Sequence, residues 1–131
     1  MARILIVDDE PAILTLLRFI LEKAGHEVDE AVHGLEALRK LGVEPRDDAT
    51  PLPDLVVLDL MMPIMDGHKA YLRIIDNPRT ANLPVVVVTA KGDMRALFDS
   101  MPSVAAFFHK PFDPGSLREA IAKALPPPKK A

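Results

Sequence analysis

The chain has 131 residues, of which 49% are apolar and 27% charged, proportions that predict one compact globular domain. It contains no cysteine, which excludes a disulfide framework, a thiolate nucleophile and a zinc-thiolate site and fits the reducing cytoplasm, where we expect the protein. Its 16 basic and 19 acidic residues give a net charge of -3, so we expect no direct nucleic acid binding. The apolar run at the N-terminus stops at Asp8, too early for a signal peptide or a membrane span.

Four short apolar runs rich in β-branched residues predict the strands of a parallel sheet. Continuous apolar runs are typical of strands covered on both faces, whereas a half-exposed strand alternates apolar and polar residues. A fifth segment, residues 27–32, does alternate, and we expect it at an edge of the sheet. The four continuous runs are residues 4–7, 55–58, 85–88 and 104–108.

Helical patterns occupy the intervals between these runs. The clearest covers residues 12–24, where apolar residues recur with helical spacing and Gly25 follows as a C-cap. A fivefold alternation of strand and helix predicts a doubly wound α/β domain, because parallel strands need crossover connections. The other expected helices are residues 35–41, 67–76, 93–100 and 116–125.

Three further segments lie outside the regular alternation. Residues 42–53 carry three prolines and an acidic pair, which predicts an unusually long exposed loop. Pro102 must end the preceding helix at or before Met101. Residues 126–131, with the sequence PPPKKA, predict a flexible solvated tail, so we expect the domain to comprise residues 1–125.

Polar residues follow each of the four continuous strands. Asp8 and Asp9 come after the first run, Asp59 after the second, Thr89 after the third and Lys110 shortly after the fourth. In an open parallel sheet these ends lie along one edge, where ligands bind. Clustered carboxylates need a compensating cation, and oxygen ligands without cysteine favour Mg²⁺ over zinc. With a lysine and a hydroxyl added, this edge suits an incoming dianion such as a phosphoryl group.

Each of these residues also has an ordinary structural explanation. Asp8 and Asp9 can cap the following helix, and Asp59 can be a simple loop carboxylate. Thr89 can be a structural hydroxyl, and Lys110 a solvated charge. Their joint occurrence at four strand ends is what favours a functional site.

Four segments resemble the receiver domain of two-component response regulators. They are IVDDEP at residues 6–11, LDLMMPIMDG at 58–67, TA at 89–90 and KPF at 110–112, in the order typical of that family. The resemblance covers almost the whole chain, to about Leu125. It implies a CheY-like, flavodoxin-like sheet of five parallel strands in the order 2-1-3-4-5, flanked by five helices.

The resemblance also implies a phosphorylation reaction. Asp59 would accept a phosphoryl group from the phosphohistidine of a sensor histidine kinase or a histidine phosphotransfer protein. Asp9, Asp59 and the backbone carbonyl of Met61 would bind Mg²⁺, for which Mn²⁺ can substitute, while Asp8 would act mainly through a metal-bound water. Lys110 would bind the phosphoryl oxygens.

A conformational switch follows from the same resemblance. Thr89 would move to the phosphoryl group, assisted by the backbone N–H of Ala90, and Phe107 would turn into the vacated space. The face made by the fourth helix, fifth strand and fifth helix would then change and bind a downstream effector, which the sequence does not identify. Homodimerisation on phosphorylation is a further option. The Lys110–Pro111 peptide bond is expected to be cis, and Phe107 can equally be an ordinary core aromatic.

Such a protein is a signalling phosphoacceptor, which catalyses only its own phosphorylation and dephosphorylation. We expect slow dephosphorylation, because Met61 and Lys91 carry no group suited to orienting an attacking water. Residues 42–53 and 100–106 depart from the family pattern, and one residue is missing between Thr89 and Lys110. An atypical output face is therefore expected.

Two other functions compete with this interpretation. An aspartate-nucleophile phosphohydrolase on a similar sheet would need an acid/base carboxylate two residues after Asp59, where Met61 stands. A receiver-like binding module without phosphorylation fits less well, because all five candidate residues at the strand ends are present. No DNA-binding or catalytic domain follows Leu125, so we expect either a single-domain regulator or a piece of a longer protein.

Overall fold

The computed structural model describes residues 2–60, 66–90, 96, 99–101 and 103–125. Within them the chain forms a five-stranded, all-parallel sheet with the strand order β2-β1-β3-β4-β5. The predicted doubly wound fold and its strand order are therefore confirmed. The strands are β1 (Arg3–Val7), β2 (Glu27–Ala31), β3 (Leu55–Leu58), β4 (Val85–Thr89) and β5 (Ala106–His109).

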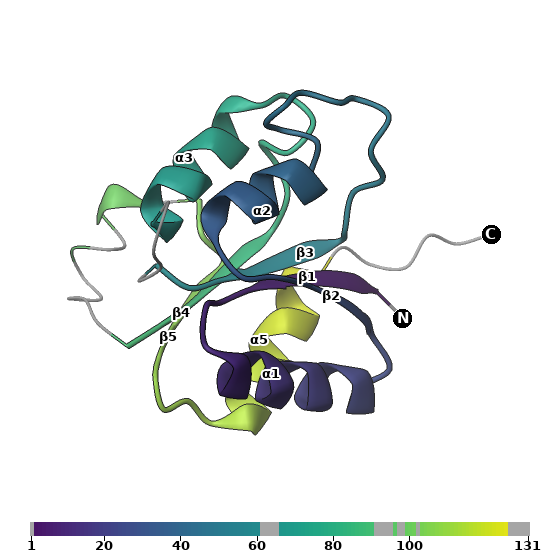
Figure 1. The fold of residues 1–131 in the computed structure, drawn as a ribbon. Coiled ribbons are helices and arrows are strands. Elements are labelled where there is room, and N and C mark those ends of the chain that lie inside the picture. The colour runs from purple at the N-terminus through teal and green to yellow at the C-terminus, as the bar shows by residue number, and fades with distance from the viewer. Residues whose placement is uncertain (1, 61–65, 91–95, 97–98, 102, 126–131) are drawn as a thin grey trace.

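The helices form two layers, one on each side of the sheet. Helices α1 and α5 cover one face, and α2 and α3 cover the other (Figure 1). The helix expected at residues 93–100 falls largely outside the described residues. Of the helices that are described, none is long and apolar enough to cross a membrane. They are α1 (Pro11–Lys23), α2 (Gly34–Lys40), α3 (Gly67–Asp76) and α5 (Pro114–Ala124).

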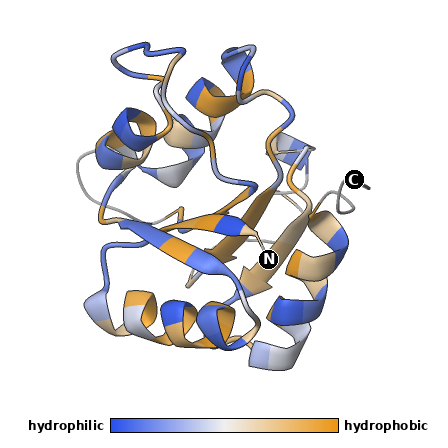
Figure 2. Cartoon of the chain, turned by 90° about the vertical axis from the view of Figure 1, so that its right-hand side faces the viewer, coloured by the Kyte–Doolittle hydropathy of each residue, from blue (hydrophilic) through white to orange (hydrophobic). Residues whose placement is uncertain are grey.

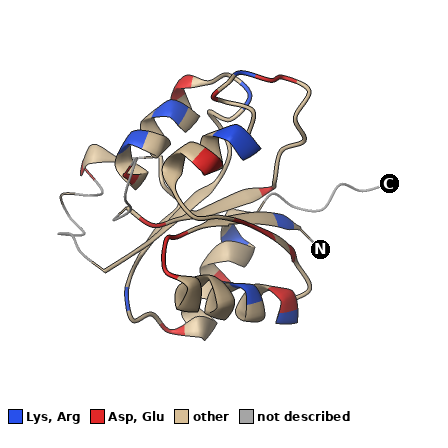
Figure 3. Cartoon of the chain, viewed as in Figure 1, with Lys and Arg blue, Asp and Glu red and all other residues tan. Residues whose placement is uncertain are grey.

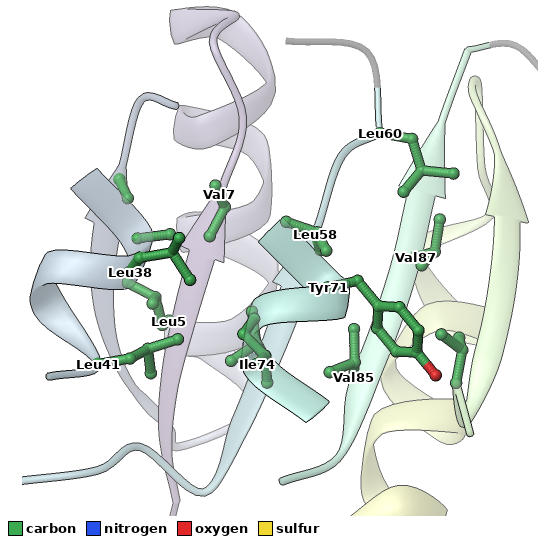
Figure 4. Packing of buried hydrophobic residues seen from close by; sticks show 14 of the residues in the cluster. Leu5, Val7, Leu38, Leu41, Leu58, Leu60, Tyr71, Ile74, Val85 and Val87 are labelled. Atoms are coloured by element: carbon green, nitrogen blue, oxygen red, sulfur yellow. The ribbon is translucent and has the colours of Figure 1, made fainter. Parts of the chain in front are cut away.

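Alternate residues of each central strand enter two different hydrophobic clusters. In β1, Ile4 and Ile6 belong to the cluster with α1 and α5, whereas Leu5 and Val7 belong to the cluster with α2 and α3. Figure 4 shows the second cluster, and Figure 2 shows the hydrophobic central strands lying between the two helix layers. Both faces are covered, which explains why the strands are continuously apolar.

The two edge strands differ from the central ones. Strand β2 alternates exposed and half-buried residues before its buried last residue, as its sequence predicts. Strand β5 begins at Ala106, two residues later than predicted. The reason is a turn in which the backbone N–H of Val104 donates to the carbonyl of Met101, so pairing with β4 starts only after it.

The long connection between α2 and β3 is anchored to the body of the domain. Val43 is buried in the cluster with α2 and α3, and the Arg79 guanidinium donates to the backbone carbonyls of Asp47 and Thr50. Residues 45–49 are exposed, as predicted for this loop. The loop therefore exposes residues 45–49 to solvent but is anchored by the side chain of Val43 and by the backbone carbonyls of Asp47 and Thr50.

Candidate functional site

The carboxyl ends of four strands bring the predicted polar residues to one edge of the sheet. Asp8 directly follows β1, Asp59 follows β3, Thr89 ends β4 and Lys110 follows β5. Val7 pairs with Leu58 across the parallel ladder, which places Asp8 and Asp59 side by side. The connection between β1 and α1 is an unbroken acidic stretch (Figure 3).

The ammonium of Lys110 joins three carboxylates. Its Nζ lies 2.7 Å from Asp8 Oδ2, 3.1 Å from Glu10 Oε1 and 3.4 Å from Asp59 Oδ2. Asp8 and Asp59 are only 1% and 2% exposed, and the side chain of Lys110 is 9% exposed. The structure therefore brings together residues more than 50 positions apart, as the strand-end argument predicts.

Backbone hydrogen bonds fix the positions of these residues. The N–H of Asp59 donates to the Val7 carbonyl at 3.0 Å, and the N–H of Lys110 donates to the Thr89 carbonyl at 2.9 Å. The Lys110–Pro111 peptide bond is cis, as the resemblance implies. A second cis bond, Glu44–Pro45, was not predicted.

The charges at the site do not balance within the described protein atoms. Burial raises the pKa of the Asp8 carboxyl above its usual range, despite the hydrogen bond from Lys110. Burial alone would lower the pKa of Lys110, but its hydrogen bonds to Asp8 and Glu10 and the charge of Asp59 raise it overall. Lys110 is therefore charged at neutral pH, and one ammonium faces several carboxylates. A divalent cation would offset the remaining negative charge.

Four carboxylates lie close enough together for some of them to hold a metal ion. Asp8, Asp9, Glu10 and Asp59 each offer one oxygen, and these oxygens all lie within 4.8 Å of one another. A hard, all-oxygen set suits Mg²⁺, and the exposed side chains of Asp9 and Glu10 leave room for bound waters. Met61, whose carbonyl was expected to be a further ligand, lies outside the described residues.

The residues expected to act in the switch occupy different environments. Thr89 is fully buried at the end of β4, while Ala90 is exposed. Phe107 pairs with Val87 in the sheet and packs, half-buried, against the cluster with α2 and α3. Lys91, expected to influence water access, lies outside the described residues.

Two residues of the site were not assigned a role from the sequence. Glu10 contacts Lys110, although its position before Pro11 indicates only the start of a helix. Gly67 lies against the residues after β3, and a Cβ placed on it would be 2.1 Å from the Asp59 carbonyl oxygen. The aspartate-glycine pair at residues 66–67 was a usable signal for this close approach, whereas nothing local indicates the contact of Glu10.

Comparisons with known proteins agree with this geometry. A family model described as the response regulator receiver domain matches residues 4–122. The chain is 36% identical over 127 residues to sporulation initiation phosphotransferase F of Bacillus subtilis, covering 95% of this chain and 94% of that protein. It is 40% identical over 114 residues to the DNA-binding dual master transcriptional regulator RpaA of Synechocystis sp., covering 86% of this chain. The chain spans only 44% of the length of that regulator.

Solved structures show the same fold. The response regulator protein TrrA from Thermotoga maritima, in complex with Mg²⁺ and BeF, matches with a TM-score of 0.79 and 32% identity. The match covers 95% of this chain and 100% of that one. Chemotaxis protein CheY4 of Vibrio cholerae matches with a TM-score of 0.78 and 26% identity, over 95% and 99% of the two chains.

Proposed function

Because this chain belongs to the response regulator receiver domain family, we propose that Asp59 accepts a phosphoryl group in a Mg²⁺-dependent reaction. The observation that carries the proposal is the convergence of Asp8, Asp59 and Lys110, whose Nζ contacts both buried carboxylates. The donor would be the phosphohistidine of a sensor histidine kinase or of a histidine phosphotransfer protein. The product is an acyl phosphate on Asp59.

The chemistry follows from the placement of charge. An oxygen of Asp59 attacks phosphorus in line, while the bond from phosphorus to the histidine nitrogen breaks and its electron pair returns to the imidazole. Lys110 donates to the phosphoryl oxygens and offsets their charge. Asp9, Asp59 and the backbone carbonyl of Met61 would bind Mg²⁺ directly, and Asp8 would bind it through a water. The ion would supply further positive charge. Slow dephosphorylation is part of the proposal, because Met61 and Lys91 carry no group suited to orienting an attacking water.

Phosphorylation would be transmitted to the surface by a local switch. The hydroxyl of Thr89 and the N–H of Ala90 would bind the new phosphoryl oxygens, and Phe107 would turn inward as Thr89 moves. Phe107 has no hydroxyl, so its inward position would depend on packing alone. We propose that the surface around β5 and α5, together with residues 93–100, changes on phosphorylation. The changed surface then binds the effector or a second copy of the chain.

The boundaries of the phosphoaccepting domain are also part of the proposal. Residues 1–125 would form the phosphoaccepting domain, because α5 ends at Ala124 and completes the cluster with α1. Residues 126–131 would be a tail without a part in the chemistry.

Labelling with acetyl phosphate and Mg²⁺ tests the proposal. We expect one phosphate per chain, labile to hydroxylamine, lost in Asp59→Asn and absent when EDTA removes the metal. Asp76→Asn, an exposed carboxylate at the end of α3, is the control and should label normally. Continuous turnover of phosphate monoesters would instead indicate a phosphohydrolase, and no labelling would indicate a binding module.

A further inference from the structure

The Lys110 ammonium lies within hydrogen-bond distance of three carboxylates in this structure. A lysine ammonium has three N–H donors, and Lys110 has three carboxylate partners, Asp8, Glu10 and Asp59, at 2.7, 3.1 and 3.4 Å. A phosphoryl oxygen that arrives at Lys110 must therefore displace one of these carboxylates.

The three carboxylates differ in how easily they can leave. Asp8 is 1% exposed and also accepts a hydrogen bond from the backbone N–H of Glu10, so releasing it would leave a buried charge without its ammonium. Asp59 is 2% exposed and carries the reacting oxygen. The side chain of Glu10 is 56% exposed, so water can solvate its carboxylate at once. Glu10 is therefore the partner that leaves.

Glu10 has no competing structural task in the helix that it precedes. It occupies the N-cap position of α1, but its side chain makes no capping hydrogen bond. Its carboxylate points instead to Lys110, with which it forms an ion pair. A change of this side chain should therefore affect Lys110 without weakening the helix start.

We propose that Glu10 is a positioning residue. Its carboxylate accepts a hydrogen bond from the Lys110 ammonium, and the incoming phosphoryl group needs that same N–H donor. The inference rests on the proposed function and adds a competition between Glu10 and the phosphodonor. Glu10 also places a negative charge beside the approaching anion. Both effects raise the donor concentration needed for phosphorylation, whereas the rate of transfer at saturation depends on Asp59 and is little affected.

Glu10→Gln tests the inference by separating donor binding from transfer. With Mg²⁺ saturating, the acetyl phosphate concentration for half-maximal labelling should fall about twofold to fivefold, while the maximal rate stays within about twofold. The affinity for beryllofluoride, followed by ¹⁹F NMR, should rise by a similar factor. Both differences from the unmodified protein, in the half-maximal acetyl phosphate concentration and in the beryllofluoride affinity, should become smaller as salt is added, because an exposed ion pair is screened.

Glu22→Gln is the matched control. Glu22 lies on the same helix, its side chain is 52% exposed, and it pairs with Arg18 at 3.3 Å, away from the site. This variant should leave both affinities unchanged.

Two outcomes overturn the inference while leaving the proposed function intact. One is an unchanged half-maximal concentration and beryllofluoride affinity in Glu10→Gln. The other is a loss of Mg²⁺ affinity of about tenfold or more together with weaker labelling, which would make Glu10 a metal ligand. A failure of the unmodified protein to label at all overturns the proposed function, and this inference with it.

Discussion

The ammonium of Lys110 lies 2.7 Å from the carboxylate of Asp8, although 102 positions separate the two residues in the chain. The contact exists because β1 and β5 run parallel in one sheet, with β3 and β4 between them, and both residues directly follow their strands. It is a buried ion pair, which contributes to stability only while both partners are present. The residues proposed to carry the chemistry are therefore also residues on which folding depends.

Removing Lys110 should destabilise the metal-free protein. Lys110→Ala leaves Asp8 and Asp59 buried without their ammonium, and we expect a loss of roughly 3 kcal/mol in the free energy of unfolding. Urea denaturation in EDTA measures it. Lys123→Ala, which removes an exposed pair with Glu119, should change stability by less than about 1 kcal/mol. Equal effects of the two substitutions would contradict a structural role for the buried pair.

Mg²⁺ should stabilise the folded chain, because binding to the folded state alone shifts the unfolding equilibrium. At ten times its dissociation constant the ion should add about 1.4 kcal/mol and raise the unfolding midpoint by roughly 5 °C. Asp9→Asn should remove most of this gain, since Asp9 is exposed and offers an oxygen to the acidic cluster. Thermal unfolding with and without Mg²⁺ measures the effect, with Asp76→Asn as control. A full gain in Asp9→Asn would exclude Asp9 as a ligand.

Much of the sheet was predictable because its strands are buried on both faces. A continuous run such as Leu55–Leu58 cannot be a half-exposed strand, and β1 and β4 follow the same rule. If the strands are parallel, their carboxyl ends lie at the same edge of the sheet, and the residues that follow them meet there. This is why the order of residues along the chain is enough to predict that Asp8, Asp59 and Lys110 lie together.

Contacts made by flexible side chains across the fold were not predictable in the same way. The contact of Glu10 with Lys110 depends on the conformation of the Glu10 side chain. The hydrogen bond from Arg79 to the loop after α2 depends on the path of that loop. The late start of β5 depends on one turn closed by Val104. None of these leaves a periodic pattern in the sequence.

His26 should make stability depend on pH. Its Nδ1 accepts a hydrogen bond from the backbone N–H of Ala2 at 3.2 Å, which requires the neutral ring. Burial, and secondly the positive N-terminus, lower the pKa of His26 below its usual 6.5. As pH falls below about 6.5 the unfolded state therefore binds the proton first, and stability decreases until the folded state is protonated too.

Urea denaturation between pH 5 and 7.5 measures this dependence, and His26→Gln should flatten it. His109→Gln, at an exposed position on β5, is the control and should leave the slope unchanged. A slope in His26→Gln equal to that of the unmodified protein would assign the pH dependence to other groups.

Gly67 should be intolerant of a side chain because it approaches the backbone that carries Asp59. In Gly67→Ala the new Cβ would lie 2.1 Å from the Asp59 carbonyl oxygen and 2.7 Å from Leu60 Cα, so backbone must shift. The hydrogen bond from the Gly67 N–H to the Leu60 carbonyl would be strained by that movement. We expect a loss of about 1–3 kcal/mol in the free energy of unfolding.

The nearest displaced atom belongs to Asp59, the proposed phosphoacceptor, so labelling of the folded Gly67→Ala protein by acetyl phosphate should also slow, because in-line attack is sensitive to small misplacements. Gly115→Ala is the control at another helix start, since its new Cβ would meet side chains and no backbone, with Asp113 Oδ2 at 3.3 Å and a guanidinium nitrogen of Arg118 at 3.8 Å. That variant should label normally and unfold at the same or a higher temperature, because alanine favours the helix more than glycine. Normal labelling in Gly67→Ala, despite lower stability, would show that the residues after β3 can shift without moving the carboxylate of Asp59.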